Sequence, residues 1–330
     1  MIDQWLIAPL SDAFGHAHQA LFEAVVQPAL FHLGFGNLLE DAYDATGWLL
    51  IGCLQLLVMI GLMGPLQRLW PVERMSRGES VRVDVIYTLI HRLGLFRLGM
   101  FFAIQPVLDM AFGEATLHGW TGIQLDALLG GVWPGVLDTA WASLVMYLLL
   151  FDLIDYGLHR GQHHFNRWWA LHAVHHCQRH MTMWSDNRNH LLDDMLRDVI
   201  LAVVARAVGV PPGQFVAIVA ITQLVESFSH ANVRIGFGWL GERLLVGPQF
   251  HRMHHGIGVG HEDGVPGTLG GCNFAVLFPI WDILFGTARF DKAPVPTGIR
   301  DQLPEFGGRD YGRGFWAQQW LGLRRLLAGH

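Results

Sequence analysis

Histidines occur in three short clusters whose spacing is typical of metal ligands. The clusters contain His159 and His163 in HRGQH, His172, His175 and His176 in HAVHH, and His251, His254 and His255 in HRMHH. On a helix, residues three or four positions apart lie on the same face, so each cluster should direct its imidazoles toward one point. Imidazole binds iron, zinc, copper and nickel, so the ligand type narrows the choice of metal without fixing it.

The clustered histidines outnumber the ligands that a single metal ion needs. A structural zinc ion takes four ligands, and a catalytic zinc ion leaves one position open. The clusters therefore predict a centre with two metal ions. Two further histidines are candidates to complete the ligand set: His230 in ESFSHAN and His190 in NRNH. An ordinary polar contact is the alternative for His190.

Two carboxylates precede candidate ligands by one helical turn. Asp155 precedes His159, and Glu226 precedes His230. A carboxylate in this position can accept the second ring N–H of a ligating histidine and fix its tautomer. An ordinary contact between helix neighbours is the alternative for both. Asp152, two turns before His159, is a more distant candidate for the same role.

The composition is that of a membrane protein. The chain has 330 residues, of which 52% are hydrophobic and 15% are charged, a poor match to a soluble surface. The formal net charge of −6 includes no basic block with interleaved aromatic residues, so no nucleic-acid partner is expected. The three cysteines form no C-x-x-C pair, which disfavours a disulfide framework or an iron–sulfur site.

Apolar stretches predict several crossings of a membrane. No cleaved signal peptide is expected, and residues 1–40 read as an amphipathic lead-in. Residues 46–66, 93–112 and 134–154 are predicted spans, joined by a cytoplasmic stretch over 67–92 and an external loop over 113–133. Acidic residues precede the first span and arginines follow it, so the positive-inside tendency places the histidine clusters on the cytoplasmic side.

Shorter apolar segments follow the third span. Residues 196–228 should form a hairpin that turns at the Pro-Pro-Gly of 211–213. Residues 273–285 are too short to span, so they should form an interfacial helix or pack in the core. The amphipathic residues 315–327 predict a tail helix at the interface.

Together these patterns predict an all-α fold. We expect a polytopic helical membrane protein with a histidine-rich helical cap at its cytoplasmic face that holds a dinuclear metal site. The expected divisions are 1–133 for the lead-in and first two transmembrane helices, 134–290 for the catalytic domain, and 291–330 for a cytoplasmic tail with an amphipathic helix.

Residues 140–290 resemble the fatty acid hydroxylase superfamily, also called the sterol desaturase family. The resemblance lies in DLIDYGLHRGQHHFNRWWALHAVHH, SHAN, GPQFHRMHHG and NFAVLFPIWDILFGT. It implies an integral membrane, non-haem di-iron oxygenase that hydroxylates or desaturates a lipid such as a fatty acyl chain or a sterol. The implied ligands are His159, His163, His172, His175, His176, His230, His251, His254 and His255. Zinc is a possible substitute for iron in purified protein.

Such an oxygenase needs O₂ and a source of electrons. The chain has no dinucleotide fingerprint, flavin motif or iron–sulfur cysteine set, so a ferredoxin or a cytochrome b5-type protein is the expected donor. Arg160, Arg167, Arg179 and Arg188 lie around the first two clusters and would meet an acidic carrier.

Two other classes of protein stay open as alternatives. A zinc-dependent membrane hydrolase is disfavoured because the H-E-x-x-H helix of a metalloprotease is absent. A metal transporter or a membrane haem protein is disfavoured because the predicted spans carry few polar residues and the clusters sit at one face.

Overall fold

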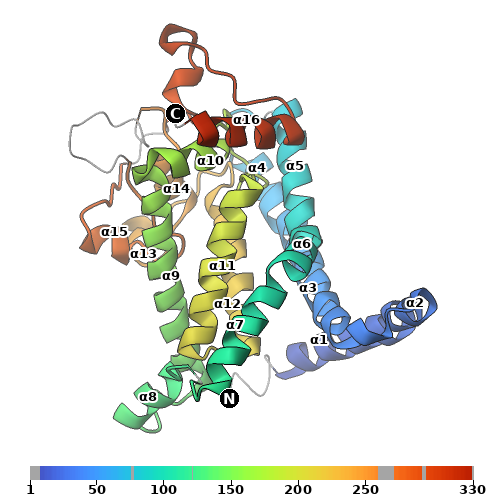
Figure 1. Ribbon diagram of the computed structural model, residues 1–330. Coiled ribbons are helices and arrows are strands. Elements are labelled where there is room, and N and C mark those ends of the chain that lie inside the picture. The colour runs from blue at the N-terminus through green and yellow to red at the C-terminus, as the bar shows by residue number, and fades with distance from the viewer. Residues whose placement is uncertain (1–7, 76–77, 121, 259–270, 292–294, 329–330) are drawn as a thin grey trace.

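Long helices stand side by side in the body of the molecule, and shorter helices cover one end of it (Figure 1). The computed structural model describes residues 8–75, 78–120, 122–258, 271–291 and 295–328. Every regular element in these ranges is a helix, as predicted. Besides the helices named below, there are π-helical segments at Phe22–Val26 and Met59–Met63 and 3₁₀ turns at Gly36–Leu38, Arg300–Gln302 and Pro304–Phe306.

The first span is confirmed as part of a long continuous helix. Helix α3 (Leu39–Val58) continues through the π-helical segment into α4 (Gly64–Leu69). The combined helix Gly36–Leu69 is long and apolar enough to cross a membrane. Before it, α1 (Ala8–Leu21) and α2 (Gln27–Leu33) extend away from the body (Figure 1).

The second span was predicted with the wrong bounds. Residues 93–112 follow the end of α5 (Glu79–Arg92) and contain α6 (Leu95–Ala103) and the first part of α7 (Gln105–Leu117). Gly94 ends α5 in the left-handed conformation, at φ +80°, and Pro106 cannot continue α6 because it lacks a backbone N–H. The apolar pair is therefore Ser80–Arg92 with Leu95–Ala103, bent by 51°. Residues 80–92, expected in a cytoplasmic stretch, thus lie within the bundle.

The third span begins later and ends later than predicted. Helix α9 (Ala140–His164) begins after Thr139, whose side chain accepts a hydrogen bond from the amide of Ala142, and it runs on through the first histidine cluster. Part of the loop expected over 113–133 is helical, because α7 extends to Leu117 and α8 covers Leu125–Val132. The described residues thus contain two helices able to cross a membrane, or three with the bent pair.

The predicted hairpin is confirmed. Helix α11 (Leu191–Val208) ends at Gly209, which has φ +77°, and α12 (Pro212–Ser229) begins at the proline pair. Tyr147 and Phe151 of α9 pack with Leu201 of α11 and Ile218 of α12 in the largest buried apolar cluster. This packing fixes the position of the helices that carry the histidines.

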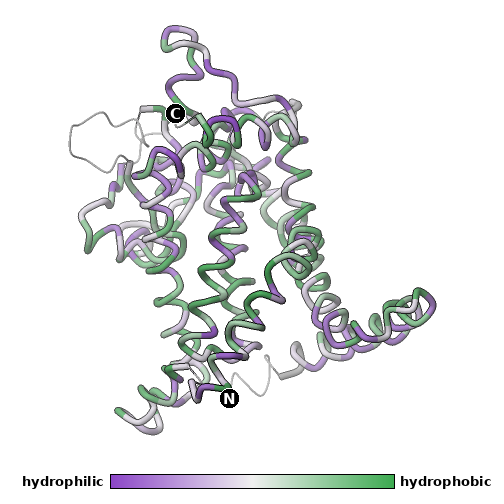
Figure 2. Tube along the Cα trace, in the orientation of Figure 1, coloured by the Kyte–Doolittle hydropathy of each residue, from purple (hydrophilic) through white to green (hydrophobic). Residues whose placement is uncertain are grey.

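Short helices cover the end at which the histidines lie. They are α10 (Asn166–His176), α13 (Gly238–Leu244), α14 (Pro248–His254), α15 (Ile280–Leu284) and α16 (Phe315–Ala328). The predicted tail helix is confirmed as α16, which packs on α10 and leaves Trp316 and Trp320 exposed. Figure 2 shows mostly hydrophobic residues along the long helices and more hydrophilic ones around this covered end.

Candidate metal centre

Nine buried histidines gather into two groups at the covered end of the bundle. The first group contains His159, His163, His172, His176 and His254, and the second contains His175, His230, His251 and His255. Within each group, one ring nitrogen of every histidine lies within 4.8 Å of those of the others. Helices α9, α10 and α14 and the end of α12 supply these residues. Two such groups match the number of ions predicted from the sequence.

The second cluster divides between the two groups. His172 and His176, four residues apart, face the first group, whereas His175 faces the second. Neighbouring residues on a helix differ in direction by about 100°, so His175 and His176 cannot serve the same point. The expectation that this cluster directs all its imidazoles toward one point was therefore wrong, and one helix supplies both groups.

The third cluster divides in the same way. His254 faces the first group, while His251 and His255 face the second, with their Nε2 atoms 3.2 Å apart. The Nε2 atom of His230 lies 3.1 Å from that of His251 and 3.2 Å from that of His175. Four Nε2 atoms from three elements thus converge on one point.

These separations fit ligands that share one ion. Metal–nitrogen bonds to zinc are roughly 2.0–2.1 Å long, so two nitrogens bound at right angles lie about 3 Å apart. In the first group, the Nε2 atoms of His176 and His254 are 3.1 Å apart. In addition, the Nε2 atoms of His159 and His172 are buried and have no hydrogen-bond partner among the described residues. The donor set therefore fits two metal ions with imidazole ligands.

A short segment at 272–274 orients two histidines of the first group. The carbonyl of Phe274 lies 2.8 Å from His159 Nδ1, and the carbonyl of Cys272 lies 2.7 Å from His254 Nδ1. A carbonyl only accepts, so each Nδ1 carries the proton and each Nε2 is left with a free lone pair. Asn273, between the two carbonyls, adopts φ +58° and donates to the carbonyl of Phe250.

Two buried aspartates support this segment from either side. Asp282 accepts hydrogen bonds from the amides of Phe274 and Ala275, at 2.9 and 2.8 Å. The carboxylate of Asp152 accepts from the three amides of residues 276–278. Asp152, a candidate partner of His159, therefore acts on the backbone that positions His159. Asp282 lies in the WDILFGT sequence, whose role the sequence alone did not reveal.

Asp193 is the carboxylate that contacts a clustered histidine directly. Its Oδ2 lies 3.1 Å from His172 Nδ1, and its Oδ1 accepts from Gln162 Nε2 and Trp168 Nε1. This is the role expected of a carboxylate behind a metal ligand. Sequence reasoning missed Asp193, because no helical spacing relates it to His172.

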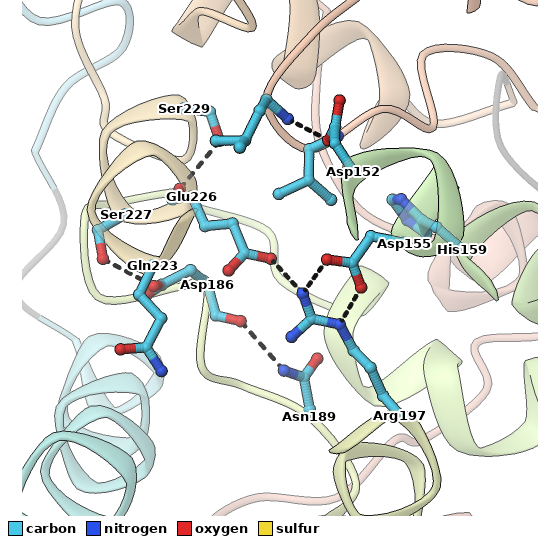
Figure 3. A network of polar contacts seen from close by, with 12 residues as sticks. Asp152, Asp155, His159, Asp186, Asn189, Arg197, Gln223, Glu226, Ser227 and Ser229 are labelled. Atoms are coloured by element: carbon cyan, nitrogen blue, oxygen red, sulfur yellow. Dashed lines mark hydrogen bonds and ion pairs between the residues drawn. The ribbon is translucent and has the colours of Figure 1, made fainter. Parts of the chain in front are cut away.

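The carboxylates of Asp155 and Glu226 do not contact their predicted partners, His159 and His230, but a shared arginine. Asp155 accepts two hydrogen bonds from Arg197, at 2.7 and 2.9 Å, and Glu226 lies 3.6 Å from the same guanidinium. Figure 3 shows Arg197 between them. His230 Nδ1 is held instead by the backbone carbonyl of Glu226, at 2.8 Å. Neither carboxylate is therefore the hydrogen-bond partner of the histidine that follows it by one turn.

His190 lies outside both groups. Its Nδ1 accepts from the amide of Leu192 at the start of α11, and its Nε2 lies 2.8 Å from the carbonyl of Gln319 in α16. Both ring nitrogens thus contact the backbone, and the ring packs against Gly322. His190 connects α11 to α16, and we leave it out of the proposed ligand set.

Burial favours the neutral form of at least five clustered imidazoles. It lowers the pKa of His254 to about 3, and it lowers the pKa values of His175, His176, His251 and His255 well below the usual range. The positive charges that neighbouring imidazoles would carry act in the same direction on the last four. A neutral imidazole is the form that binds a metal ion.

Comparison with known proteins agrees with this geometry. The family model described as fatty acid hydroxylase matches residues 144–287. An ornithine lipid hydroxylase of Rhizobium tropici is 24% identical over 54% of this chain and 56% of its own length. An alkylglycerol monooxygenase of Danio rerio is 27% identical, over 51% of this chain and 35% of its own. A Delta(7)-sterol 5(6)-desaturase of Gibberella zeae is 25% identical, over 59% and 55%.

The similarity is confined to part of each protein. The matches span about a third to a little over half the length of these curated relatives. No solved structure was found to match the chain. The part of the chain that matches the fatty acid hydroxylase model, residues 144–287, contains all nine clustered histidines.

Proposed function

We propose that this chain is a membrane-bound, non-haem di-iron oxygenase that hydroxylates or desaturates a lipid. The observation that carries the proposal is the division of nine buried histidines into two groups, with Nε2 atoms 3.1–3.2 Å apart in each. The match of residues 144–287 to the fatty acid hydroxylase model supports iron and oxygen chemistry among the reactions open to such a centre.

The reaction needs O₂, two electrons and two protons in addition to the lipid. In hydroxylation, one oxygen atom enters a C–H bond to give an alcohol, and the other leaves as water. In desaturation, two hydrogens leave neighbouring carbons and both oxygen atoms leave as water. Bound iron would supply the activation of O₂, and the histidines of the two groups would hold it.

The protein's own residues hold the ligands in place. The carbonyls of Cys272 and Phe274, the carboxylate of Asp193 and the carbonyl of Glu226 fix the direction of four imidazoles. Ligands that are held in advance do not have to reorganise during each turnover. The burial of the histidines also keeps bulk water away from the reacting groups.

Electrons would come from a ferredoxin or a cytochrome b5-type protein on the cytoplasmic side. Of the four arginines predicted to meet an acidic carrier, Arg188 is buried and pairs with Asp84. Arg160 is half-buried and donates to the hydroxyl of Tyr156. Arg167 and Arg179 are exposed and are the two that we propose for docking. Charge reversal of both should slow reduction by an acidic carrier but not by dithionite.

Metal content is the first test of the proposal. Detergent-purified protein from iron-replete cells should contain about two iron ions per chain by mass spectrometry. The variants His254→Ala and His175→Ala should each lose about one ion, because they remove ligands from different groups. His164→Ala is the matched control, since His164 is exposed and lies outside both groups.

Activity is the second test. The iron-loaded protein, supplied with a chemical reductant, O₂ and a membrane lipid extract, should give lipid products that carry ¹⁸O from ¹⁸O₂ if it hydroxylates, or that lose two mass units if it desaturates. Zinc in freshly purified protein would call for reloading with ferrous iron before this assay. Folded protein that binds no metal after reloading would overturn the proposal.

A further inference from the structure

A large cavity lies between the N-terminal helices and the hairpin of α11 and α12. Its volume is about 930 Å³, near the upper end of the range for small-molecule sites. Most of its lining is apolar and includes Trp48 and Leu49 of α3, Phe101 of α6, Leu201 of α11 and Phe215 of α12. Helices α3, α6, α11 and α12 belong to the body of the bundle (Figure 1). The size and lining of this cavity suit a hydrocarbon chain.

A second, smaller space lies directly beside the histidines. This chamber has a volume of about 70 Å³, enough for a few water molecules or for the end of a ligand. His159 and His172 of the first group line it, together with His175, His230 and His251 of the second group. A ligand that enters the chamber therefore meets both proposed metal sites.

Six polar residues line both the cavity and the chamber, and we call them the mouth. They are Asp155, Asp186, Asn189, Asp194, Arg197 and Glu226. Figure 3 shows five of them, from α9, α11 and α12 and from the segment before α11. The mouth joins the apolar cavity to the histidines, so a ligand that occupies both spaces must pass its polar part through this ring.

The charge of the mouth disfavours an anion. Four of its six residues are carboxylic acids and one is a guanidinium. That guanidinium, Arg197, already binds Asp155 through two hydrogen bonds and lies beside Glu226. Arg92 and Arg97 also line the cavity but not the chamber. The guanidinium of Arg97 stacks on the ring of Trp48, and that of Arg92 already donates to Asp186. An anionic head group in the mouth would thus face an excess of carboxylates.

One carboxylate oxygen of the mouth lacks a donor. Asp186 is only 8% exposed, and its Oδ2 accepts from Arg92 and Ser227. Its Oδ1 is buried and has no hydrogen-bond partner among the residues that the structure describes. An unpaired buried acceptor is costly, so a ligand that supplies an O–H or N–H donor would be stabilised at this point.

We propose that the cavity binds a single-chain lipid head-first, with its tail between α3, α6, α11 and α12 and an uncharged or cationic hydrogen-bond-donating head group in the mouth. A hydroxyl and an ammonium share this chemistry. If the protein is the proposed oxygenase, this binding mode has a consequence for the product. The oxidised carbon should lie within a few bonds of the head group rather than at the far end of the chain.

Binding of lipids that share one tail tests the head-group preference. The probes are hexadecylglycerol ether, hexadecylamine, hexadecanoate, hexadecyl phosphate and hexadecane, each titrated into detergent-purified protein and counted by native mass spectrometry. We expect the ether or the amine to bind at least about tenfold more tightly than the two anions, as for a charge-assisted hydrogen bond. Tighter binding of either anion, or equal binding of all five, would overturn the proposal.

Two mouth variants connect the preference to named residues. Asp186→Asn should weaken binding of the preferred probe about tenfold by replacing an acceptor oxygen. Glu226→Gln removes an ionisable carboxyl group from the mouth. It should reduce the difference in affinity between hexadecylamine and hexadecanoate. Asp186 also pairs with Arg92, so Asp186→Asn could fail to fold. In that case Glu226→Gln still tests the mouth. An unchanged preference in a folded Glu226→Gln protein would count against the mouth.

A pair of neighbouring substitutions tests the position of the tail. Ala202 of α11 lines the cavity, whereas Val203 does not and is 38% exposed. Ala202→Phe should displace several methylenes of the tail and so weaken binding of hexadecylglycerol ether about tenfold. Binding of octylglycerol ether, which has a shorter tail, should be affected less. Val203→Phe, the matched control, should bind both like the wild type. Equal effects of the two variants would place the tail elsewhere.

These measurements use no O₂ and no turnover, so they are independent of the proposed function. If the lipids bind as expected but the protein holds no iron, only the oxygenase proposal fails. If iron binds and lipid is oxidised but the anions bind best, only the present inference fails. Tandem mass spectrometry of the oxidised product then locates the new oxygen or double bond relative to the head group.

Discussion

The directions of four clustered imidazoles, those of His159, His172, His230 and His254, are set by the acceptor behind each ring. Three of the acceptors are backbone carbonyls, those of Glu226, Cys272 and Phe274, and one is the carboxylate of Asp193. A carboxylate raises the basicity of the imidazole that it contacts more than a carbonyl does, because it carries a full charge. His172 is therefore the ligand whose affinity for metal depends most on a single side chain.

We expect Asp193→Asn to weaken metal binding at the first group by about 10- to 100-fold, because the hydrogen bond to His172 loses its charge. Competition with a chelator of known affinity would measure this. The second group should bind as in the wild type, since Asp193 contacts none of its members in the described residues. Asp291→Asn is the control, as Asp291 is exposed. Equal weakening at both groups would show a general loss of structure instead.

The metal-free protein should lose stability as the pH falls. Burial lowers the pKa of His254 from 6.5 to about 3 and lowers those of four other clustered histidines, so the unfolded state binds more protons than the folded state in this window. The stability is fully present above about pH 6.5 and is lost as the pH falls toward 3.

Thermal unfolding of chelator-treated protein in detergent, from pH 8 to pH 4, would measure this loss. The double variant His175→Ala with His254→Ala has fewer buried imidazoles to protonate, so its melting temperature should fall less steeply. A melting temperature of the wild type that stays level through this range would contradict the prediction.

At the scale of elements, the segment after Cys272 has an unusual role. It has no helix of its own until α15, yet it supplies two carbonyls to the first histidine group. Asp152 and Asp282 bind its amides, and Asn273 holds its turn with φ +58°. The position of two ligands thus depends on a segment that contains no ligand itself.

We expect Asn273→Gly to destabilise the protein by about 2–4 kcal/mol, because three buried side-chain hydrogen bonds of Asn273 are lost. Asn273→Ala should cost about 1 kcal/mol more, because alanine is strained at positive φ whereas glycine is not. Thermal or denaturant unfolding, with metal content measured in parallel, would rank the three proteins. An alanine variant as stable as the glycine variant would show that the turn changes conformation.

The contact between His190 and α16 gives a second prediction at this scale. A Cβ atom added at Gly322 would lie 2.5 Å from Cδ2 of His190, so Gly322→Ala should loosen α16 from α10 and α11. Limited proteolysis of the 307–314 segment should become faster, while the metal content stays at the wild-type value. Gly213→Ala in α12 is the control, because no atom lies within 4 Å of the added Cβ there. Loss of metal from Gly322→Ala would show that the position of His190 affects the metal centre, which we do not expect.

At the scale of the whole molecule, the two proposed metal sites lie at one end of a largely apolar bundle (Figure 2). The residues that would contact lipid and those that would contact a soluble electron donor are therefore on different parts of the surface. We propose that the covered end faces the cytoplasm, because the arginine-rich segment after the first span and the tail lie with it.

Labelling of an introduced cysteine would test this orientation. Asp310 is exposed in the segment before α16, so Asp310→Cys should react with a membrane-impermeant maleimide in inside-out vesicles but not in intact cells. The native cysteines are buried or half-buried, which keeps background labelling low. The protein should also stay in the membrane fraction after an alkaline wash. Labelling in intact cells would reverse the proposed orientation.

Local patterns in the sequence were sufficient for the helical class, the first span, the existence of the third apolar helix though not its bounds, the hairpin and the tail helix. Each of these depends on hydropathy or helical spacing within about twenty residues, which a single segment expresses by itself. The second span was misplaced because its apolar character continues across Gly94 and Pro106, while the backbone conformation changes there. Hydropathy does not register such a break.

The sequence by itself also determined which histidines have ligand chemistry, since their type and spacing are local. Only the tertiary structure decided how they divide into two groups and what stands behind each ring. His159 meets a carbonyl 115 residues away, and the carboxylate beside His172 comes from another helix, where no spacing rule relates the two. Asp155 and Glu226 had the right spacing, but Arg197 lay close enough to bind both. A buried carboxylate pairs with the strongest donor that the fold brings near it, and that choice is made between elements rather than within one.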